Sequence, residues 1–158
     1  MAPYESPVFP IVGIGASAGG LAAFEAFFAG MPADAEPGMA FVIVQHLAPD
    51  HKSILTELIR LYTRMEVHEV EDGMPVQNNS AYIIPPGCDM ASLNGTLQLL
   101  EPSARRGHRM PIDFFFRSLA SDQNERAIGI VLSSTGSDGT EGVRVIKASG
   151  GMVMAEDP

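Results

Sequence analysis

Residues 11–20 constrain this chain most, because a short apolar run rich in β-branched residues ends there at a serine flanked by glycines. Four large apolar residues follow at helical spacing: Leu21, Phe24, Phe27 and Phe28. The sequence therefore predicts a strand, a sharp turn and a helix. Residues 15–19 also satisfy the pattern G-x-S-x-G, in which glycines allow the tight turn that exposes a serine hydroxyl. Amides that open the helix would face negative charge developing beside Ser17.

Three interpretations of this turn are open from the motif alone. A nucleophilic Ser17 needs a base and an acid from elsewhere in the chain. A dinucleotide site would use Gly13, Gly15 and Gly19 as a loosened G-x-G-x-x-G motif. In the third interpretation Ser17 only caps the helix.

Unbroken apolar runs at residues 40–44 and 127–132 indicate strands that are covered on both faces. Strands of this kind, alternating with helices, are typical of a parallel sheet, so we expect an α/β fold with a doubly wound, mostly parallel Rossmann-like sheet. Residues 66–100 alternate loosely and contain the Asn94-Gly95 pair, a strong signal for a hairpin. We interpret this region as small antiparallel strands near one edge of the sheet.

Three further helices are predicted from caps and spacing. Ser53 can cap a helix over residues 54–62, and residues 140–148 form another. Pro111 begins the third, whose apolar face we assign to Phe114, Phe115 and Leu119. A last strand, residues 152–155, is followed by no covering helix, so we expect residues 1–158 to be one domain that is incomplete at its C-terminal end.

Composition excludes several classes of function. A net charge of −9 with only 10 lysines and arginines argues against nucleic acid as a partner. The single cysteine, Cys88, cannot form an internal disulfide. No secretory signal is visible and no apolar run is long enough for membrane insertion, so we expect a cytoplasmic protein. The four histidines match no zinc-site spacing, and we expect neither a metal nor a cofactor.

Ser17, His46 and Asp138 each lie just past the carboxyl end of an expected parallel strand. Loops at that edge of a doubly wound sheet gather around one site, so these three side chains are expected to converge. Each has a structural explanation when taken alone, as a cap, a locally satisfied ring or a turn residue. Together, a serine hydroxyl, an imidazole and a carboxylate are the catalytic groups of many enzymes that transfer acyl groups. The dinucleotide interpretation loses ground, because Gln45 and His46 stand where a ribose-binding acid would be expected.

Five segments carry a resemblance to a known family: residues 15–20 (GASAGG), 45–46 (QH), 81–87 (AYIIPPG), 108–113 (HRMPID) and 135–139 (TGSDG). In this order they are similar to the signatures of the catalytic domain of the chemotaxis protein-glutamate methylesterases, the CheB family. The resemblance implies a parallel α/β sheet and hydrolysis of glutamate γ-methyl esters on chemoreceptors, with deamidation of receptor glutamines in many members.

Carried over by position, the resemblance implies that Ser17 is the nucleophile, His46 the general base and then acid, and Asp138 the residue that orients His46. Backbone amides of Ala18 and of the loop around Thr135 would hold the oxyanion. Many stand-alone members have threonine at position 18 and methionine at position 135, so this chain lacks a side-chain contribution at the first of them.

The resemblance also implies partners, namely the cytoplasmic helices of methylated chemoreceptors. Stand-alone members carry a receiver domain ahead of the catalytic one, which we do not expect here. A chain that starts at this domain looks like the amino-terminal module of a fusion with a CheR-type methyltransferase.

Arg105, Arg106, His108 and Arg109 form the most concentrated positive charge in the sequence. They are either a solvated loop or a contact surface for an acidic partner. A different class of function, a regulatory module that binds receptors without turnover, also remains open at this point.

Overall fold

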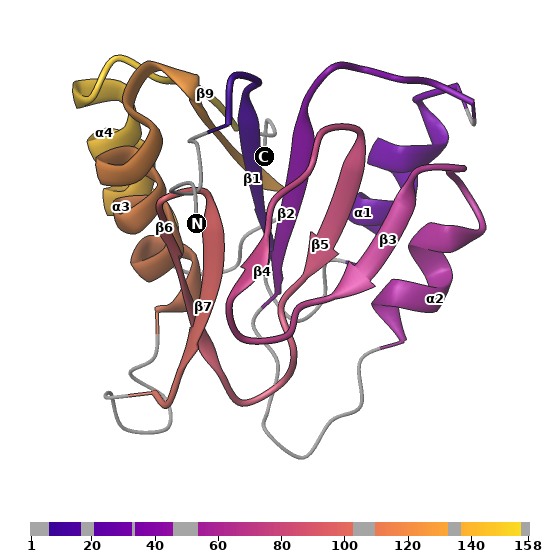
Figure 1. Ribbon diagram of the computed structural model, residues 1–158, viewed down its shortest axis with the longest axis horizontal. Helices are drawn as coiled ribbons and strands as arrows, with labels where there is room; N and C mark the ends of the chain where they lie inside the picture. Colours follow the sequence, from indigo (N-terminus) through magenta and orange to yellow (C-terminus); the bar gives the residue numbers. More distant parts are fainter. Residues whose placement is uncertain are drawn as a thin grey trace, which may run out of the picture.

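The computed structural model describes residues 7–16, 21–32, 34–45, 54–102, 110–132 and 137–155. Its elements in chain order are β1 (Ile11–Ala16), α1 (Leu21–Ala29), β2 (Ala40–Gln45), α2 (Leu55–Arg60), β3 (Glu66–Glu69), β4 (Met74–Pro75), β5 (Ser80–Ile83), β6 (Asp89–Leu93), β7 (Thr96–Leu100), α3 (Pro111–Gln123), a short 3-10 helix (Asn124–Arg126), β8 (Ala127–Leu132), α4 (Thr140–Ala148) and β9 (Met152–Ala155). Figure 1 shows a central sheet between two layers of helices.

The central sheet has six strands in the order β3-β5-β2-β1-β8-β9. All of its strand pairs are parallel, which confirms the expected α/β fold with a parallel sheet. The chain moves outward from β1 through β2 in one direction and later returns to the other side of β1 as β8. The order therefore reverses at β1, and a doubly wound sheet binds ligands beside the carboxyl ends of the strands at such a point.

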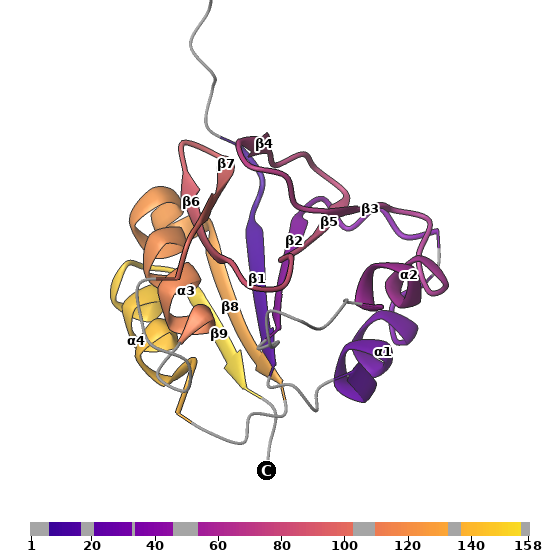
Figure 2. The same ribbon diagram turned by 90° about the horizontal axis from the view of Figure 1, so that it is seen from below.

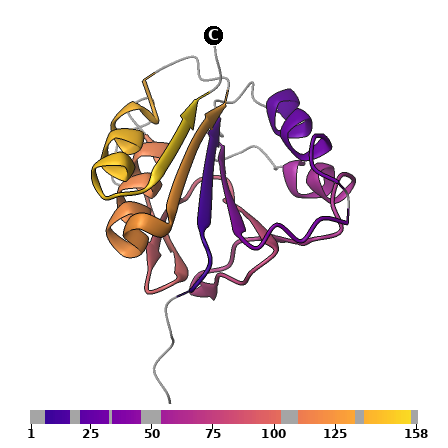
Figure 3. The same ribbon diagram turned by 90° about the horizontal axis from the view of Figure 1, so that it is seen from above.

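Helices α1 and α2 cover one face of this sheet, and α3 and α4 cover the other, as the end-on views show (Figures 2 and 3). The side chains of β1 alternate between these two faces. Val12 and Ile14 belong to the core that contains Phe24 and Phe28 of α1. Ile11 belongs to the opposite core, beneath α3. All six residues of β1 are buried, as expected for a strand in the middle of a three-layer fold.

The glycines of β1 let α3 lie very close to the sheet. A Cβ atom at Gly13 would lie 2.8 Å from the ring of Phe116, and one at Gly15 would lie 2.6 Å from Cγ2 of Ile112. Both distances are well below ordinary carbon contacts of about 3.5 to 4.0 Å. Gly13 and Gly15 therefore act as packing residues, and they fix how closely the first two turns of α3 lie against β1.

A second sheet with three antiparallel strands, in the order β4-β7-β6, lies beside α3. The predicted hairpin at Asn94-Gly95 is confirmed, since β6 and β7 pair from Leu93 and Thr96 outward and both turn residues have positive φ angles of 52° and 74°. Two such residues are what the right-handed twist of a two-residue hairpin requires.

The expectation that all of residues 66–100 are antiparallel was wrong for part of the region. β3 and β5 are parallel strands at one edge of the main sheet. Gly73 does make a turn, with φ of 81°, but that turn leads into β4, which pairs with β7 and not with β3. Local alternation predicted strands correctly, while the pairing partners were set by contacts distant in sequence.

The predicted apolar face of α3 also needs correction. Phe115 and Leu119 are buried as expected, but Phe114 is 38% exposed and Phe116 takes the buried position. The predicted cap at Ser53 lies outside the described residues. Across the described ranges, no helix is both long and apolar enough to span a membrane.

Candidate functional site

The carboxyl ends of the three central strands lie side by side in register. Ala16, the last residue of β1, is paired with Gln45 at the end of β2 and with Leu132 at the end of β8. Neighbouring strands are about 4.8 Å apart, so the points where the chain leaves these strands are close together. Ser17 and His46 directly follow Ala16 and Gln45 in the sequence, and both lie outside the described residues.

Asp138 is the one member of the predicted catalytic set that the structure describes, and it sits at the amino end of α3. Its carboxylate accepts hydrogen bonds from the amide of Ile112 (3.1 Å, to Oδ2) and from the amide of Asp113 (2.8 Å, to Oδ1). Met110, the N-cap residue of α3, makes no side-chain capping bond. The carboxylate therefore supplies the capping group that the helix lacks, and the helix dipole favours its negative charge.

Ile112 connects this carboxylate to the end of β1. Its backbone amide binds Asp138, while its side chain packs directly over Gly15, one residue before Ala16. Ile112 is 1% exposed, so the contact is part of the core. Asp138 is thus anchored to the same helix turn that covers the carboxyl end of β1, which is the edge where the sequence analysis placed it.

The remaining predicted site residues lie outside the described residues: Ala18, Arg105, Arg106, His108, Arg109 and Thr135. Their roles stay predictions.

The dinucleotide interpretation required Gly13, Gly15 and Gly19 to form a phosphate-binding loop. Gly13 and Gly15 instead lie inside β1 and face Phe116 and Ile112 of α3. In a dinucleotide site the glycine that follows the strand leaves its backbone open to the pyrophosphate. Gly13 and Gly15 are covered by side chains, which argues against that interpretation.

Asp113 is a buried acid that the sequence analysis did not single out. It is 3% exposed, and its Oδ1 accepts hydrogen bonds from the amides of Gly139 (2.9 Å) and Gly142 (2.7 Å) at the start of α4. The available signal was its position two residues after Pro111, in the first turn of a predicted helix, where acids are favoured.

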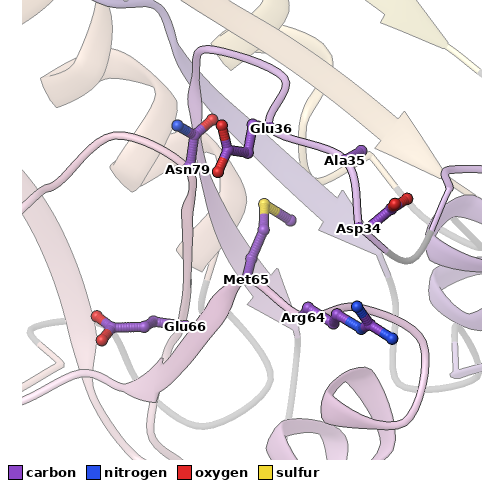
Figure 4. A pocket seen from close by; sticks show the side chains of 7 residues that line it. All are labelled: Asp34, Ala35, Glu36, Arg64, Met65, Glu66 and Asn79. Carbon is purple, nitrogen blue, oxygen red and sulfur yellow. The ribbon is translucent and has the colours of Figure 1, made fainter.

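Two cavities in the described part of the chain lie away from the strand-end site. One of about 380 Å³ is lined by residues at or just before the starts of β2, β3 and β5, and therefore lies at the amino ends of these strands. Figure 4 shows Arg64 across this cavity from Asn79, with the side chain of Met65 pointing toward Glu36. The other, of about 690 Å³, lies between the β6–β7 hairpin and the C-terminal half of α3. Ligands of a doubly wound sheet bind at the opposite edge from the first.

Asp122 organises the hairpin side of α3. Burial opposes its ionisation, but hydrogen bonds from Gln123, Ser92 and the amides of Gly95 and Asn94 outweigh that effect and keep its pKa below the ordinary value of 3.8. The donor–acceptor distances are 2.8 Å, 2.7 Å, 3.1 Å and 2.6 Å respectively. The Asp122 carboxylate is therefore ionised, and its hydrogen bonds connect α3 to the β6–β7 turn.

Within the described ranges, no three histidine, cysteine or acidic side chains are grouped as metal ligands would be.

Comparison with known proteins identifies one family. The family model described as CheB methylesterase matches residues 12–158. The crystal structure of the Thermotoga maritima CheB methylesterase catalytic domain superimposes with a TM-score of 0.81 at 29% identity, covering 96% of this chain and 81% of that one. The fold expected from the family resemblance is thereby confirmed.

Two curated relatives agree in sequence. A protein-glutamate methylesterase/protein-glutamine glutaminase of Geobacillus kaustophilus is 36% identical over 149 residues, which cover 91% of this chain and 42% of the relative. An uncharacterized 104.1 kDa protein of Rhodobacter capsulatus is 42% identical over 104 residues, which cover 66% of this chain and 11% of the relative. The chain thus spans less than half the length of these relatives.

Proposed function

Because the chain belongs to the CheB methylesterase family, we propose that it hydrolyses glutamate γ-methyl esters on the cytoplasmic helices of chemoreceptor proteins. One observation carries this proposal beyond family membership. The ends of β1 and β2, which precede Ser17 and His46, are paired in register, and Asp138 is anchored to the helix turn that covers the end of β1. Chain topology thus supports the convergence of a hydroxyl, an imidazole and a carboxylate.

In the proposed reaction the Ser17 hydroxyl attacks the ester carbonyl while His46 accepts its proton. His46 then protonates the departing methoxide, and methanol leaves behind an acyl-enzyme. A water molecule, deprotonated by His46, attacks that acyl group, and the glutamate carboxylate leaves as Ser17 regains its proton. Asp138 acts by orienting His46 and by stabilising its positive charge.

The negatively charged oxygen formed in each step needs donors at a fixed position. We assign this role to the backbone amides of Ala18 and Thr135, which follow the ends of β1 and β8. Losing one donor of this kind costs about 3 to 4 kcal/mol of transition-state stabilisation in comparable enzymes. Since only the backbone is required, the residue types at positions 18 and 135 do not prevent it.

The same site would deamidate receptor glutamines, because an amide differs from the ester only in releasing ammonia in place of methanol. The positively charged cluster Arg105, Arg106, His108 and Arg109 is our candidate for contact with the acidic surface of the receptor. A methyltransferase of the CheR type, fused or separate, would supply the esterified substrate. The proposed place of action is the cytoplasm.

The test is methanol release from a methylated receptor fragment. S17A should release no methanol while keeping the circular dichroism spectrum and urea midpoint of the unchanged protein. D138A should lower kcat by about 10⁴-fold, as loss of the orienting acid does in comparable triads. Unchanged methanol release by S17A would refute the assignment.

A fluorophosphonate probe separates the enzyme from a module that only binds receptors. Labelling of Ser17 that is lost in the H46A variant supports the activated nucleophile. A folded protein that binds the receptor fragment but is never labelled would indicate the binding module.

A further inference from the structure

Asp113, in the first turn of α3, and Asp138, just before α4, form a reciprocal pair in which each carboxylate caps the helix next to the other residue. The amide of Asp113 donates to Oδ1 of Asp138 at 2.8 Å, and the amide of Gly139, the residue after Asp138, donates to Oδ1 of Asp113 at 2.9 Å. Two hydrogen bonds of opposite direction thus connect two neighbouring stretches of backbone. Such a closed arrangement fixes both the distance and the orientation between the first turn of α3 and the residue that carries the Asp138 carboxylate.

Neither helix supplies its own cap. No side-chain capping bond is made by Met110 at the start of α3 or by Gly139 at the start of α4. Asp113 occupies the third helical position of α3, from which an acid usually reaches back to its own helix. Here its Oδ1 binds Gly139 and Gly142, the N-cap and third positions of α4. In a capping box, the amides at these two positions are bound by side chains of the same helix. In α4 both amides are bound by a carboxylate of α3.

The surroundings hold Asp113 in this role. Its side chain is buried where α4 crosses α3, and a Cβ atom at Gly142 would lie 2.6 Å from Cβ of Phe116 and 3.2 Å from Oδ1 of Asp113. Gly142 therefore lets the two helices come close enough for a single carboxylate oxygen to accept both α4 amides. Gly139 has φ of 107°, a conformation that favours glycine, which allows the sharp turn between Asp138 and α4.

We propose that Asp113 is a positioning residue for the esterase reaction, acting by holding Asp138 in the place from which it orients His46. This inference rests on the proposed function. Asp113 itself contacts neither substrate nor the reacting atoms. Its effect reaches the chemistry through the fixed relation between the Asp138 backbone and the two α3 amides that bind the Asp138 carboxylate.

The primary test compares D113A with D113N in steady-state methanol release. D113A removes the acceptor, and a misplacement of about 1 Å in a catalytic group costs about 10²-fold, so we expect kcat to fall about 10- to 100-fold with KM unchanged. D113N keeps an oxygen acceptor of the same shape and should recover most of the lost kcat. If D113A is not recovered folded, D113S replaces it as the milder truncation.

D122A is the matched control. Like Asp113, Asp122 is an acid of α3 that accepts hydrogen bonds from backbone amides of another segment. That segment is the β6–β7 turn and not the start of α4. D122A should lose stability and keep kcat. An equal fall of kcat in D122A, or kcat within twofold of the unchanged protein in folded D113A or D113S, would overturn the proposal.

A double substitution tests whether Asp113 acts through Asp138. The D113A/D138A protein should have the same kcat as D138A alone, because the residue being positioned is already absent. If the fold-losses of kcat in D113A and D138A multiply in the double variant, Asp113 acts by another route and the inference is wrong.

S17A separates this failure from failure of the proposed function. If S17A still releases methanol, the nucleophile assignment fails, and Asp113 has no such reaction to support. If S17A is inactive and folded D113A is fully active, only the positioning role fails.

Discussion

Replacement of Gly15 by alanine tests whether the close approach of α3 to β1 sets the geometry of the strand-end site. The added Cβ would lie 2.6 Å from Cγ2 and 2.9 Å from both Cγ1 and Cδ1 of Ile112. A β-branched side chain in a helix has one strongly preferred χ1 rotamer, so Ile112 has little freedom to rotate away. Restoring ordinary contacts of about 3.5 to 4.0 Å therefore requires the first turn of α3 to move by about 1 Å.

The magnitude follows from overpacking and from the link to Asp138. Inserting a carbon atom into a well-packed core typically costs about 1 to 3 kcal/mol. With a urea m-value of about 1 to 3 kcal/mol/M, the unfolding midpoint of G15A should fall by about 1 M. The same movement carries the Ile112 amide that binds Asp138, so kcat for methanol release should fall by up to about 10²-fold.

Urea titration followed by circular dichroism measures the first effect, and G30A is the matched control. A Cβ at Gly30 would meet only two backbone oxygens, at 3.4 and 3.6 Å, so G30A should stay within about 0.5 kcal/mol of the unchanged protein.

The G15A/I112A double substitution identifies the contact. I112A alone should cost about 2 to 5 kcal/mol, and the two losses should sum to more than the loss in the double variant, because alanine at 112 leaves room for the new Cβ. Stability of G15A equal to that of G30A, or additive losses in the double variant, would refute the reasoning.

Three other substitutions test separate parts of the structure. F116A should lower the free energy of unfolding by about 3 to 5 kcal/mol in urea titration, because the fully buried ring fills the space beside three glycines, at positions 13, 129 and 142. G95A should cost about 1 to 2 kcal/mol without changing kcat, since residue 95 has φ of 74° and its turn is bound to Asp122, near the opposite end of α3 from the amides that bind Asp138. D122N should be less stable than the unchanged protein at pH 7, and the difference should shrink as pH falls below about 4. The lowered pKa of the Asp122 carboxylate contributes stability that is lost as the group is protonated. Urea midpoints at pH 7 and pH 3 measure the difference.

Features encoded by neighbouring residues were predictable from the sequence. The apolar runs that became β2 and β8 are covered on both faces as their composition requires. The Asn94-Gly95 hairpin formed where expected, because its signal lies within the turn itself.

Features that depend on distant partners were not predictable in the same way. The alternation at β3 and β5 is compatible with either parallel or antiparallel pairing. The outcome depends on β2, some forty residues before β5, with which β5 pairs in parallel, and β3 then pairs in parallel with β5. Three consecutive phenylalanines begin at Phe114, and helical periodicity cannot choose between adjacent pairs when all three are apolar. Glycines 13, 129 and 142 decided it, because they form the surface into which Phe116 fits.

The role of Asp113 was hidden for a related reason. Its carboxylate binds amides 26 and 29 residues away, and nothing in its own neighbourhood distinguishes it from an ordinary acid in the first turn of a helix. The segment 108–113 belongs to the family signatures, yet the resemblance gave Asp113 no role. The role of Asp113 became apparent only from the hydrogen bonds that it makes across two helices.

The candidate site can be understood as a consequence of how closely α3 lies against β1. Gly13 and Gly15 remove the side chains that would keep this helix away, so the amides of its first turn reach the edge where β1, β2 and β8 end. Amides at a helix start attract a carboxylate, and Asp138 is the acid that the β8–α4 connection places there. Asp113 then joins the same turn to α4. On this view, substitutions that disturb the contacts of this turn should impair catalysis even where they leave every proposed catalytic group unchanged. G15A tests its contact with β1 and D113A tests its contact with α4.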